Sequence, residues 1–429
     1  MSERTLGVGL LGCGNVGAAV VRMLAEHGDV IALRTGVRLE AARVAVLDAG
    51  RVRDVPIDPS RMTEDASGVV ADPDVDIVCE LIGGVEPARS LILAALEAGK
   101  PVVTANKELL ANHGREIFDA ADGRGVDLYF EAAVAGGIPL IRPLKESLAG
   151  ERVARITGIV NGTTNYILTR MSEDGMSFGD ALAEAQRLGY AEADPAADVD
   201  GHDAAAKCAI LASIAFNARV VAPDVFREGI ASVSADDIAF ARRLGYVVKL
   251  LAIAELEGEQ IAARVHPAMV PAAHPLAAVR ESFNAVFVEG AKVGELMFYG
   301  RGAGGDPTAT SVVGDLVSTA RHIVNGGRGV GCTCVLQRGI RPMDDVEGQY
   351  YLLLKVEDRP GVLAEIADVF GRNRVSIKSV WQEGTGDEAQ LVFVTHRARE
   401  GAFQKTLQGL RELDVVHAVQ SVLRVEGEE

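Results

Sequence analysis

Short apolar segments alternate with helix-length segments through the first third of the chain. Glycine, proline and polar residues bound the short segments, a pattern that predicts strands at residues 6–11, 43–47, 76–80, 101–104 and 127–131. After the first strand, apolar residues recur at helical spacing at Val16, Val20, Met23 and Leu24. Strands that alternate with helices predict an α/β domain with a doubly wound parallel sheet, which we place at residues 1–135.

The pattern changes in residues 136–325, where strands and helices no longer alternate regularly. Strand patterns lie at residues 152–160, 247–254, 260–267, 284–289 and 295–299, and helical patterns at 161–173, 178–188, 203–216 and 236–244. This order predicts a central α+β domain with a mixed sheet. A further helix is expected at residues 306–323, with Asp306 as its N-cap and Pro307 in its first turn.

The tail has a compact order of its own. Residues 326–348 contain glycines, prolines and charges and are expected to form a linker. Strand patterns follow at residues 349–356, 375–381, 389–395 and 415–425, with helical patterns at 362–372 and 402–412. This βαββαβ order predicts a ferredoxin-like domain at residues 349–429.

Composition and charge exclude several classes of function and say less about the fold. The chain has 429 residues and a net charge of −17, which argues against binding to nucleic acid or to an anionic membrane. No apolar segment reaches transmembrane length, and no signal peptide precedes the first strand. The five cysteines have no disulfide framework, which favours the cytoplasm. Cys332 and Cys334 lack partners for a zinc site, so we expect ordinary buried thiols.

The first strand runs into Gly12-Cys13-Gly14-Asn15-Val16-Gly17, a GxGxxG motif between a strand and a helix. In a Rossmann-type domain the first two glycines allow a tight turn and close approach of a pyrophosphate, and the third lets helix and strand pack. The motif in this context predicts dinucleotide binding. The alternative is a tight strand-to-helix turn that binds nothing.

The second strand is expected to end at Asp48, where an acidic residue usually bonds the ribose 2′-hydroxyl of NAD. Arg43, Arg51 and Arg53 lie close by in the sequence and can receive the 2′-phosphate of NADP. The interval from Gly17 to Asp48 is also longer than usual. The residues alone therefore leave the choice between NAD and NADP open.

Residues 188–210 concentrate acidic side chains and then supply one lysine, Lys207. Asp203 and Lys207 are four residues apart, so on the predicted helix they share a face. A lysine near the start of an apolar helix needs carboxylates or water around it, and it can transfer a proton if its pKa is tuned. The alternatives are an ordinary surface ion pair and a calcium loop, although the EF-hand glycine and terminal glutamate are missing.

Three other features are open to two interpretations each. Lys107 follows a strand, where ligands bind in such sheets, or is simply a solvated residue at a helix start. The loop from Glu131 to Pro139 can direct backbone oxygens and one carboxylate at a monovalent cation, or serve as a hinge. The glycine-rich segment 300–308 can close over a cofactor or act as a flexible connection.

Several ordered motifs together resemble the homoserine dehydrogenase family over essentially the whole chain. They are GLLGCGNVG (9–17), TANK (104–107), EAAVAGGIP (131–139), NGTTNYIL (161–168), LGYAEADPAADVDGHDAAAK (188–207) and GRGAGGDPTA (300–309). The segment DRPGVL (358–363) resembles an ACT domain, a regulatory module that usually binds an amino acid. No aspartate kinase portion precedes the dehydrogenase, which implies the single-function form.

The resemblance implies reversible hydride transfer between NAD(P)H and L-aspartate 4-semialdehyde, which gives L-homoserine. It implies that Lys207 transfers the proton, that Lys107 contacts substrate and cofactor, and that Glu192 and Asp203 hold the amino-acid end of the substrate. The implied cofactor-contacting residues are Gly12, Asn15, Val16, Gly17, Asp48, Thr104, Lys107 and Gly305, in a domain completed by the helix near 306–323. The implied sodium site comprises Glu131, Val134, Gly136 and Ile138.

The family often has an arginine where Leu47 precedes Asp48, and this departure favours NAD. The resemblance further implies an amino-acid effector, with L-threonine expected, at the turn that contains Asp358, Gly361 and Val362. It also implies threonine, methionine and isoleucine biosynthesis as the pathway and a homodimer or homotetramer as the assembly. Two other functions stay open, namely another semialdehyde reductase of the same fold and a non-catalytic amino-acid sensor.

Overall fold

The computed structural model describes residues 4–384 and 389–427, and these fall into two compact units. The first comprises Met1–Ile156, Ala206–Asp224 and Asn284–Arg338, and the second comprises Thr157–Ala205, Val225–Phe283 and Gly339–Glu429. The units are interleaved along the sequence. The sequence-based boundaries at 1–135, 136–325, 326–348 and 349–429 stay a prediction.

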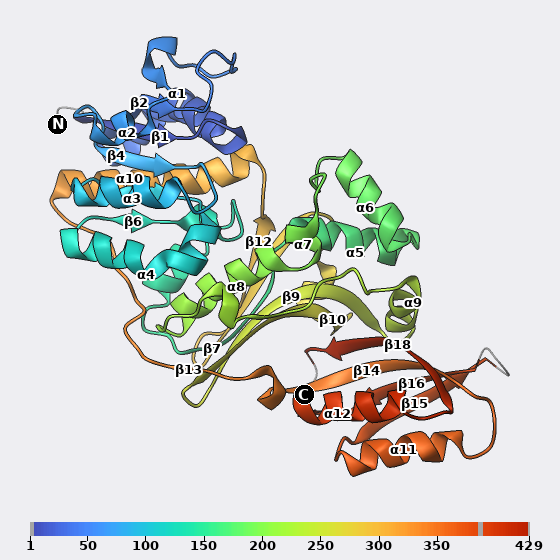
Figure 1. The fold of residues 1–429 in the computed structure, drawn as a ribbon. Helices are drawn as coiled ribbons and strands as arrows, with labels where there is room; N and C mark the ends of the chain where they lie inside the picture. Colours follow the sequence, from blue (N-terminus) through green and yellow to red (C-terminus); the bar gives the residue numbers. More distant parts are fainter. Residues whose placement is uncertain (1–3, 385–388, 428–429) are drawn as a thin grey trace. The chain divides into compact units, whose positions relative to one another are not determined.

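The first unit contains a six-stranded parallel sheet in the order β3-β2-β1-β4-β5-β6. This is the strand order of a Rossmann domain, and it confirms the predicted fold class. The strands are β1 (Arg4–Leu11), β2 (Val37–Ala45), β3 (Met62–Thr63), β4 (Ile77–Glu80), β5 (Val102–Thr104) and β6 (Leu128–Tyr129). The helices are α1 (Asn15–Thr35), α2 (Ala66–Ala71), α3 (Ala88–Glu97), α4 (Lys107–Arg124) and α10 (Gly305–Asn325) (Figure 1).

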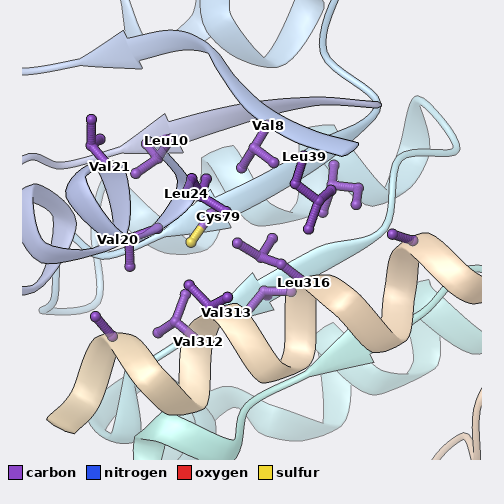
Figure 2. Packing of buried hydrophobic residues seen from close by; sticks show 14 of the residues in the cluster. Val8, Leu10, Val20, Val21, Leu24, Leu39, Cys79, Val312, Val313 and Leu316 are labelled. Atoms are coloured by element: carbon purple, nitrogen blue, oxygen red, sulfur yellow. The ribbon is translucent and has the colours of Figure 1, made fainter. Parts of the chain in front are cut away.

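Helices cover both faces of this sheet. The side chains of α1 and α10 share one core with β1, in which Val312, Val313 and Leu316 of α10 point toward Leu10 and Val20 (Figure 2). The helices α2, α3 and α4 share the other core with the same sheet. Helix α10, far along the chain, therefore belongs to the core of the first domain.

The second strand begins at Val37 and not at residue 43 as predicted. Val37 and Leu39 are buried and alternate with Arg38 and Glu40. This is the pattern of a strand, but it follows α1 after only Gly36 and is short enough to pass for a continuation of the helix. The last strand of this sheet, in contrast, is shorter than predicted, at Leu128–Tyr129.

The second unit has a mixed sheet. Its strands β9 (Tyr246–Glu257) and β10 (Gln260–Pro271) form a long antiparallel hairpin. The other edge of β10 pairs in succession with three parallel strands: β13 (Gly339–Ile340) at Gln260, β8 (Phe226–Arg227) at Arg264, and β18 (Val416–Val425) at Ala268. Before its C-terminal segment, this unit contains the helices α5 (Gly162–Asp174), α6 (Phe178–Arg187), α7 (Ala196–Val199) and α9 (Ala235–Arg243).

The C-terminal segment confirms the predicted βαββαβ order. It comprises β14 (Glu347–Val356), α11 (Val362–Arg372), β15 (Ile377–Glu383), β16 (Gln390–Thr395), β17 (Ala398–Arg399), α12 (Glu400–Arg411) and β18. The strands lie in the order β18-β14-β16-β15, with both helices packed on one core. Since β18 also pairs with β10, this domain continues the mixed sheet.

Three elements cross the boundaries of the units, namely β7 (Val153–Ile159), α8 (His202–Ala215) and β11 (Phe283–Gly290). Strand β12 (Gly294–Arg301) pairs with β11. Within the part of the chain that the structure describes, no helix is long and apolar enough to cross a membrane.

Candidate active site

The turn after β1 has the geometry that a dinucleotide-binding motif requires. Gly12 has a φ of +103°, which a residue with a side chain rarely adopts. A β-carbon at Gly17 would lie 2.3 Å from the carbonyl oxygen of Gly12, so α1 packs directly on this turn. No atom lies within 4 Å of the position a β-carbon would take at Gly14. The turn thus offers open space at its middle glycine, next to the start of α1.

The start of α10 lies beside the start of α1. A β-carbon at Gly305 would lie 2.9 Å from the backbone oxygen of Asn15, and Arg22 forms an ion pair with Asp306 at 3.6 Å. Both helices are 21 residues long. Two helix N-termini, each with free N–H groups and a positive dipole end, therefore adjoin the glycine turn, which suits a pyrophosphate. Val16, in the first turn of α1, packs on the core that the two helices share.

Asp48 does not end a strand as predicted. Strand β2 stops at Ala45, and the Asp48 carboxylate accepts hydrogen bonds from the backbone of Gly50 and Arg51 at 2.8 and 3.1 Å in an exposed turn. Arg43 is held by Asp72 at 2.7 Å. Arg53 donates to the backbone oxygens of Asp48 and Arg51.

A buried network ties together the carboxyl ends of β4 and β5. Thr104 donates to the Glu80 carboxylate at 2.5 Å, and that carboxylate also accepts the N–H groups of Ile82 and Gly83. Asn106 caps α4 through Leu109 and donates to the carbonyl of Gly84. The sequence analysis missed Glu80 and Asn106, although an acidic residue at the end of a buried strand was a signal for the first.

This network fixes the point from which Lys107 projects, because Lys107 is the first residue of α4. Its side chain is half-buried. The second candidate lysine, Lys207, lies in α8 and is also half-buried, between Ala206 and Cys208, which are buried. Asp203 and Lys207 both lie in this single helix, one turn apart.

The Glu131 loop is folded around the carboxylate of Glu131, which is 1% exposed. It accepts hydrogen bonds from the backbone of Leu140, Ile141 and Arg142 at 2.5, 2.6 and 2.9 Å, and Arg142 Nε lies 3.4 Å away. Four donors use the lone pairs of one carboxylate. The carboxylate of Glu131 is therefore already engaged by four donors, and its role at a cation site stays a prediction.

The same loop also contains backbone carbonyl oxygens, a type of ligand that sodium prefers. Ala135 and Gly136 both have left-handed φ values, of 56° and 51°, and Val134 and Ile138 are buried. A β-carbon at Gly136 would lie 2.3 Å from the carbonyl oxygen of Gly302, so this loop packs against the 300–308 segment. The hydroxyl of Ser311 donates to the carbonyl oxygen of Gly136 at 2.7 Å, and such carbonyl oxygens are donors of the hard type that alkali cations prefer.

Asp315 of α10 lies beside this loop and accepts the N–H of Glu131 at 2.8 Å. Burial raises the pKa of Asp315 to about 8. A neutral Asp315 next to the paired Glu131 limits the negative charge that this interior must hold.

In the second unit, Asn161 joins two of the acidic residues. Its side-chain nitrogen donates to Asp198 at 2.6 Å and to Asp203 at 2.9 Å, while its oxygen caps α5 through Thr164. Asp203 is half-buried, and Glu192 is exposed. The structure thus brings Asp198 and Asp203 together and leaves Glu192 on a neighbouring turn.

The ACT-like turn is built as the sequence suggested. Gly361 has a φ of +98° and caps α11, and Val362 is buried. Arg359 pairs with Glu357 and Glu365 at 2.9 and 3.2 Å. The side chain of Asp358 lies 3.5 Å from the amide nitrogen of Gln382.

Cys332 and Cys334 are not the ordinary buried thiols that we expected. Both are partly exposed and line a cavity of about 30 Å³ in the first unit, together with Lys145 and Arg219. A hydrogen bond from Cys334 lowers the pKa of Cys332 to about 6. None of the five cysteines, all of which lie in the described part of the chain, forms a disulfide. The described residues contain no group of three or more histidine, cysteine or acidic residues that can hold a metal.

Comparisons with known proteins cover the same regions. Residues 12–131 match the family model "Homoserine dehydrogenase, NAD binding domain", residues 139–317 match "Homoserine dehydrogenase", and residues 350–415 match "ACT domain". A homoserine dehydrogenase of Corynebacterium glutamicum is 51% identical over 98% of this chain and 96% of its own, and one of Mycobacterium tuberculosis is 52% identical over 99% and 98%. The crystal structure of a homoserine dehydrogenase from Thiobacillus denitrificans superposes with a TM-score of 0.93 at 40% identity, over 99% of this chain and 98% of that one.

Proposed function

The chain belongs to the homoserine dehydrogenase family of oxidoreductases, and from this we propose that it interconverts L-aspartate 4-semialdehyde and L-homoserine with NAD(P). The observation that carries the assignment of residues is α8, which places Asp203 and Lys207 one turn apart in a helix whose other side chains are largely buried. We place the reaction in threonine, methionine and isoleucine biosynthesis, in the cytoplasm.

Lys207 is the proton donor in the direction of reduction. As hydride reaches the aldehyde carbon, negative charge develops on the oxygen, and an ammonium group can stabilise this charge and then protonate it. Lys107 supplies a second positive charge from the start of α4. Glu192 and Asp203 bind the substrate ammonium through charge-assisted hydrogen bonds. The Asn161 amide nitrogen donates to both Asp198 and Asp203, so Asp198 helps to hold this amide in place beside Asp203.

The bound dinucleotide supplies the hydride. Gly12, Gly14 and Gly17 shape the turn, and the N–H groups of Asn15, Val16 and Gly305 face the pyrophosphate from two helix starts. Thr104 is buried at the end of β5, next to Lys107, and completes this edge of the site. Asp48 contacts the ribose once its turn rearranges. NAD is favoured over NADP, because Arg43 is already held by Asp72 and Leu47 is fully exposed.

A sodium ion would be held at this loop by Glu131 together with the backbone oxygens of Val134, Gly136 and Ile138. The Glu131 carboxylate contributes indirectly, by holding the chain at residues 140–142. In this arrangement the ion orders the loop that packs on the 300–308 segment, and it takes no part in proton transfer.

The C-terminal ACT domain binds L-threonine as a feedback inhibitor at the turn of Asp358, Gly361 and Val362, and its pairing generates a homodimer or homotetramer. The supporting observation is an apolar surface on this domain, where Leu363, Val380 and Trp381 are 44%, 40% and 42% exposed. Side chains of this kind on an edge strand and an adjoining helix suit association with a second copy.

The experiment that tests the proposal is homoserine oxidation, followed as the absorbance of the reduced cofactor, with NAD and NADP in parallel and with or without L-threonine. Turnover establishes the substrate and the cofactor, and a change with threonine establishes the effector. Folded protein that turns over homoserine with neither cofactor contradicts the proposal.

A further inference from the structure

Arg424 lies at the centre of a buried charge network in the second unit. It is 8% exposed, and its guanidinium donates to both oxygens of Glu400 at 3.0 and 2.8 Å. The same guanidinium donates to Glu228 at 2.5 Å. The hydroxyl of Tyr350 also donates to Glu400, at 3.0 Å. A side chain of the last ACT strand therefore joins the core of that domain to a segment outside it.

Residues 228–230, which include the Arg424 partner Glu228, contact β10 and the end of α7. The N–H of Glu228 donates to the backbone oxygen of Val265 in β10 at 2.8 Å, and the N–H of Ile230 donates to the backbone oxygen of Val199 at 2.8 Å. A β-carbon at Gly229 would lie 2.3 Å from the backbone oxygen of Val199. Residues 228–230 thus lie directly against the end of α7.

Helix α7 carries Asp198. The carboxylates of Asp198 and Asp203 both accept a hydrogen bond from the amide nitrogen of Asn161. A continuous series of contacts therefore runs from Glu400 through Arg424 and Glu228 to the carboxylates near the start of α8. Every contact in it is a hydrogen bond or a backbone packing contact within one compact unit.

We propose that Arg424 is a positioning residue for substrate binding, which acts through Glu228 and residues 228–230 on the carboxylates of Asp198 and Asp203. The ACT domain then sets the affinity for the amino-acid end of the substrate without touching it. This inference rests on the proposed function, because it takes Asp203 as a substrate-binding residue. A shared guanidinium is suited to the role, since a shift of Glu400 changes the geometry available to Glu228.

A second ion pair provides a matched control. Arg243 of α9 pairs with Glu383 of the ACT strand β15, so it also joins the ACT domain to the rest of this unit. It ends on α9 and not on residues 228–230. Glu228 and Glu383 are both partly exposed, at 41% and 34%, so the two neutral replacements each remove a carboxylate charge from a similarly exposed position.

The test compares Glu228→Gln, Arg424→Lys, Arg424→Met and the double variant Glu228→Gln/Arg424→Met with Glu383→Gln. We expect Glu228→Gln to raise KM for homoserine about tenfold, with kcat and KM for the cofactor changed by less than about twofold. Arg424→Lys keeps the positive charge but loses the planar guanidinium that bonds two carboxylates at once, so we expect an intermediate rise in KM for homoserine. The double variant should have the same KM for homoserine as Arg424→Met alone, because Arg424 acts on substrate binding through Glu228. Glu383→Gln leaves all three constants unchanged.

Hydrogen exchange supplies a readout that does not depend on turnover. The amides of residues 196–203 exchange faster in Glu228→Gln and at the wild-type rate in Glu383→Gln. Wild-type KM and wild-type exchange in Glu228→Gln overturn the inference. A wild-type protein that fails to oxidise homoserine refutes the proposed function, while the exchange of residues 196–203 still decides the link. If Arg424→Met does not fold, Glu228→Gln decides both readouts.

Discussion

Gly17 packs so closely on Gly12 that a β-carbon at Gly17 would lie 2.3 Å from the Gly12 carbonyl oxygen, whereas Gly14 between them faces open space. Gly17→Ala should therefore lower the free energy of unfolding by about 1–3 kcal/mol, the usual result of overpacking. Gly14→Ala should change it by less than about 0.5 kcal/mol and instead weaken NADH binding, because the methyl group occupies the approach of the pyrophosphate. Urea unfolding and calorimetric titration with NADH separate the two effects. The same loss in both variants contradicts this division of roles.

Lys207→Ala should reduce kcat for homoserine oxidation by about 10²–10⁴, the range for loss of a general acid–base group. The dissociation constant for the dinucleotide should stay within about twofold, since Lys207 lies outside the glycine turn and α1. Steady-state kinetics and NADH fluorescence titration measure the two quantities. Lys292→Ala, on an exposed turn, serves as the control. A near-normal rate in Lys207→Ala removes this residue from the mechanism.

Glu131→Gln should destabilise the protein by about 2–4 kcal/mol, because the neutral amide cannot accept four donors as the carboxylate does. Three backbone N–H groups and Arg142 depend on that carboxylate. Glu146→Gln, at an exposed position in the same region, should change the stability by less than about 0.5 kcal/mol. Chemical denaturation of both variants checks the prediction, which fails if the two are equally stable.

Cys332 should be alkylated by iodoacetamide faster than any other cysteine at pH 7. Its pKa is lowered to about 6 by the hydrogen bond from Cys334, so it is largely thiolate at that pH, whereas burial raises the pKa of Cys79 and Cys13. Peptide mass spectrometry after timed quenching gives the order of modification. Cys334→Ala removes the hydrogen bond and should slow the reaction at Cys332. An unchanged rate in that variant rules out Cys334 as the cause.

Stability should rise between pH 8 and 10 because of Lys249. Its ammonium is 2% exposed and donates to Asn165 and to the carbonyl of Val279, and burial lowers its pKa to about 8. Below pH 8 the folded protein must bury a charge, and above it the unfolded chain binds more protons than the folded one, up to the ordinary pKa of 10.5.

The free energy of unfolding of wild type minus that of Lys249→Met should therefore increase by about 2–3 kcal/mol from pH 7.5 to 10. Denaturation across this range measures the difference, and the common titration of other groups cancels. The corresponding difference for Lys292→Met should be flat. A difference that falls with pH for Lys249→Met reverses the sign and excludes the explanation.

The fold was predictable where local pattern and tertiary position agree. The GxGxxG turn, the alternation of strands and helices, and the βαββαβ tail were read correctly, because each is set by residues close together in sequence. Strand β2 was misplaced because Val37 and Leu39 alternate over too short a stretch, directly after a long helix. Asp48 was then expected at the end of that strand and lies in a turn.

The contacts that define the site were less accessible to the same reasoning. Glu131 was expected to face a cation, but its carboxylate is used by backbone groups nine to eleven residues later in the chain. Arg424 and Glu228 are 196 residues apart, and Asn161 and Asp203 are 42 apart. Such pairs form only when separate elements are brought together, so no periodicity in the sequence indicates them.

Three separate strands pair with the edge of β10 that faces away from β9. One of them is the C-terminal strand β18, which together with Glu426 pairs with Ala268 and Met269. Both of these β10 residues are fully buried. A protein shortened by removal of its ACT domain would present them as an open, apolar strand edge, the kind of surface on which chains aggregate. For this enzyme, removal of the ACT domain would come at a cost in solubility, and point substitutions that leave β18 in place offer the safer way to alter that domain.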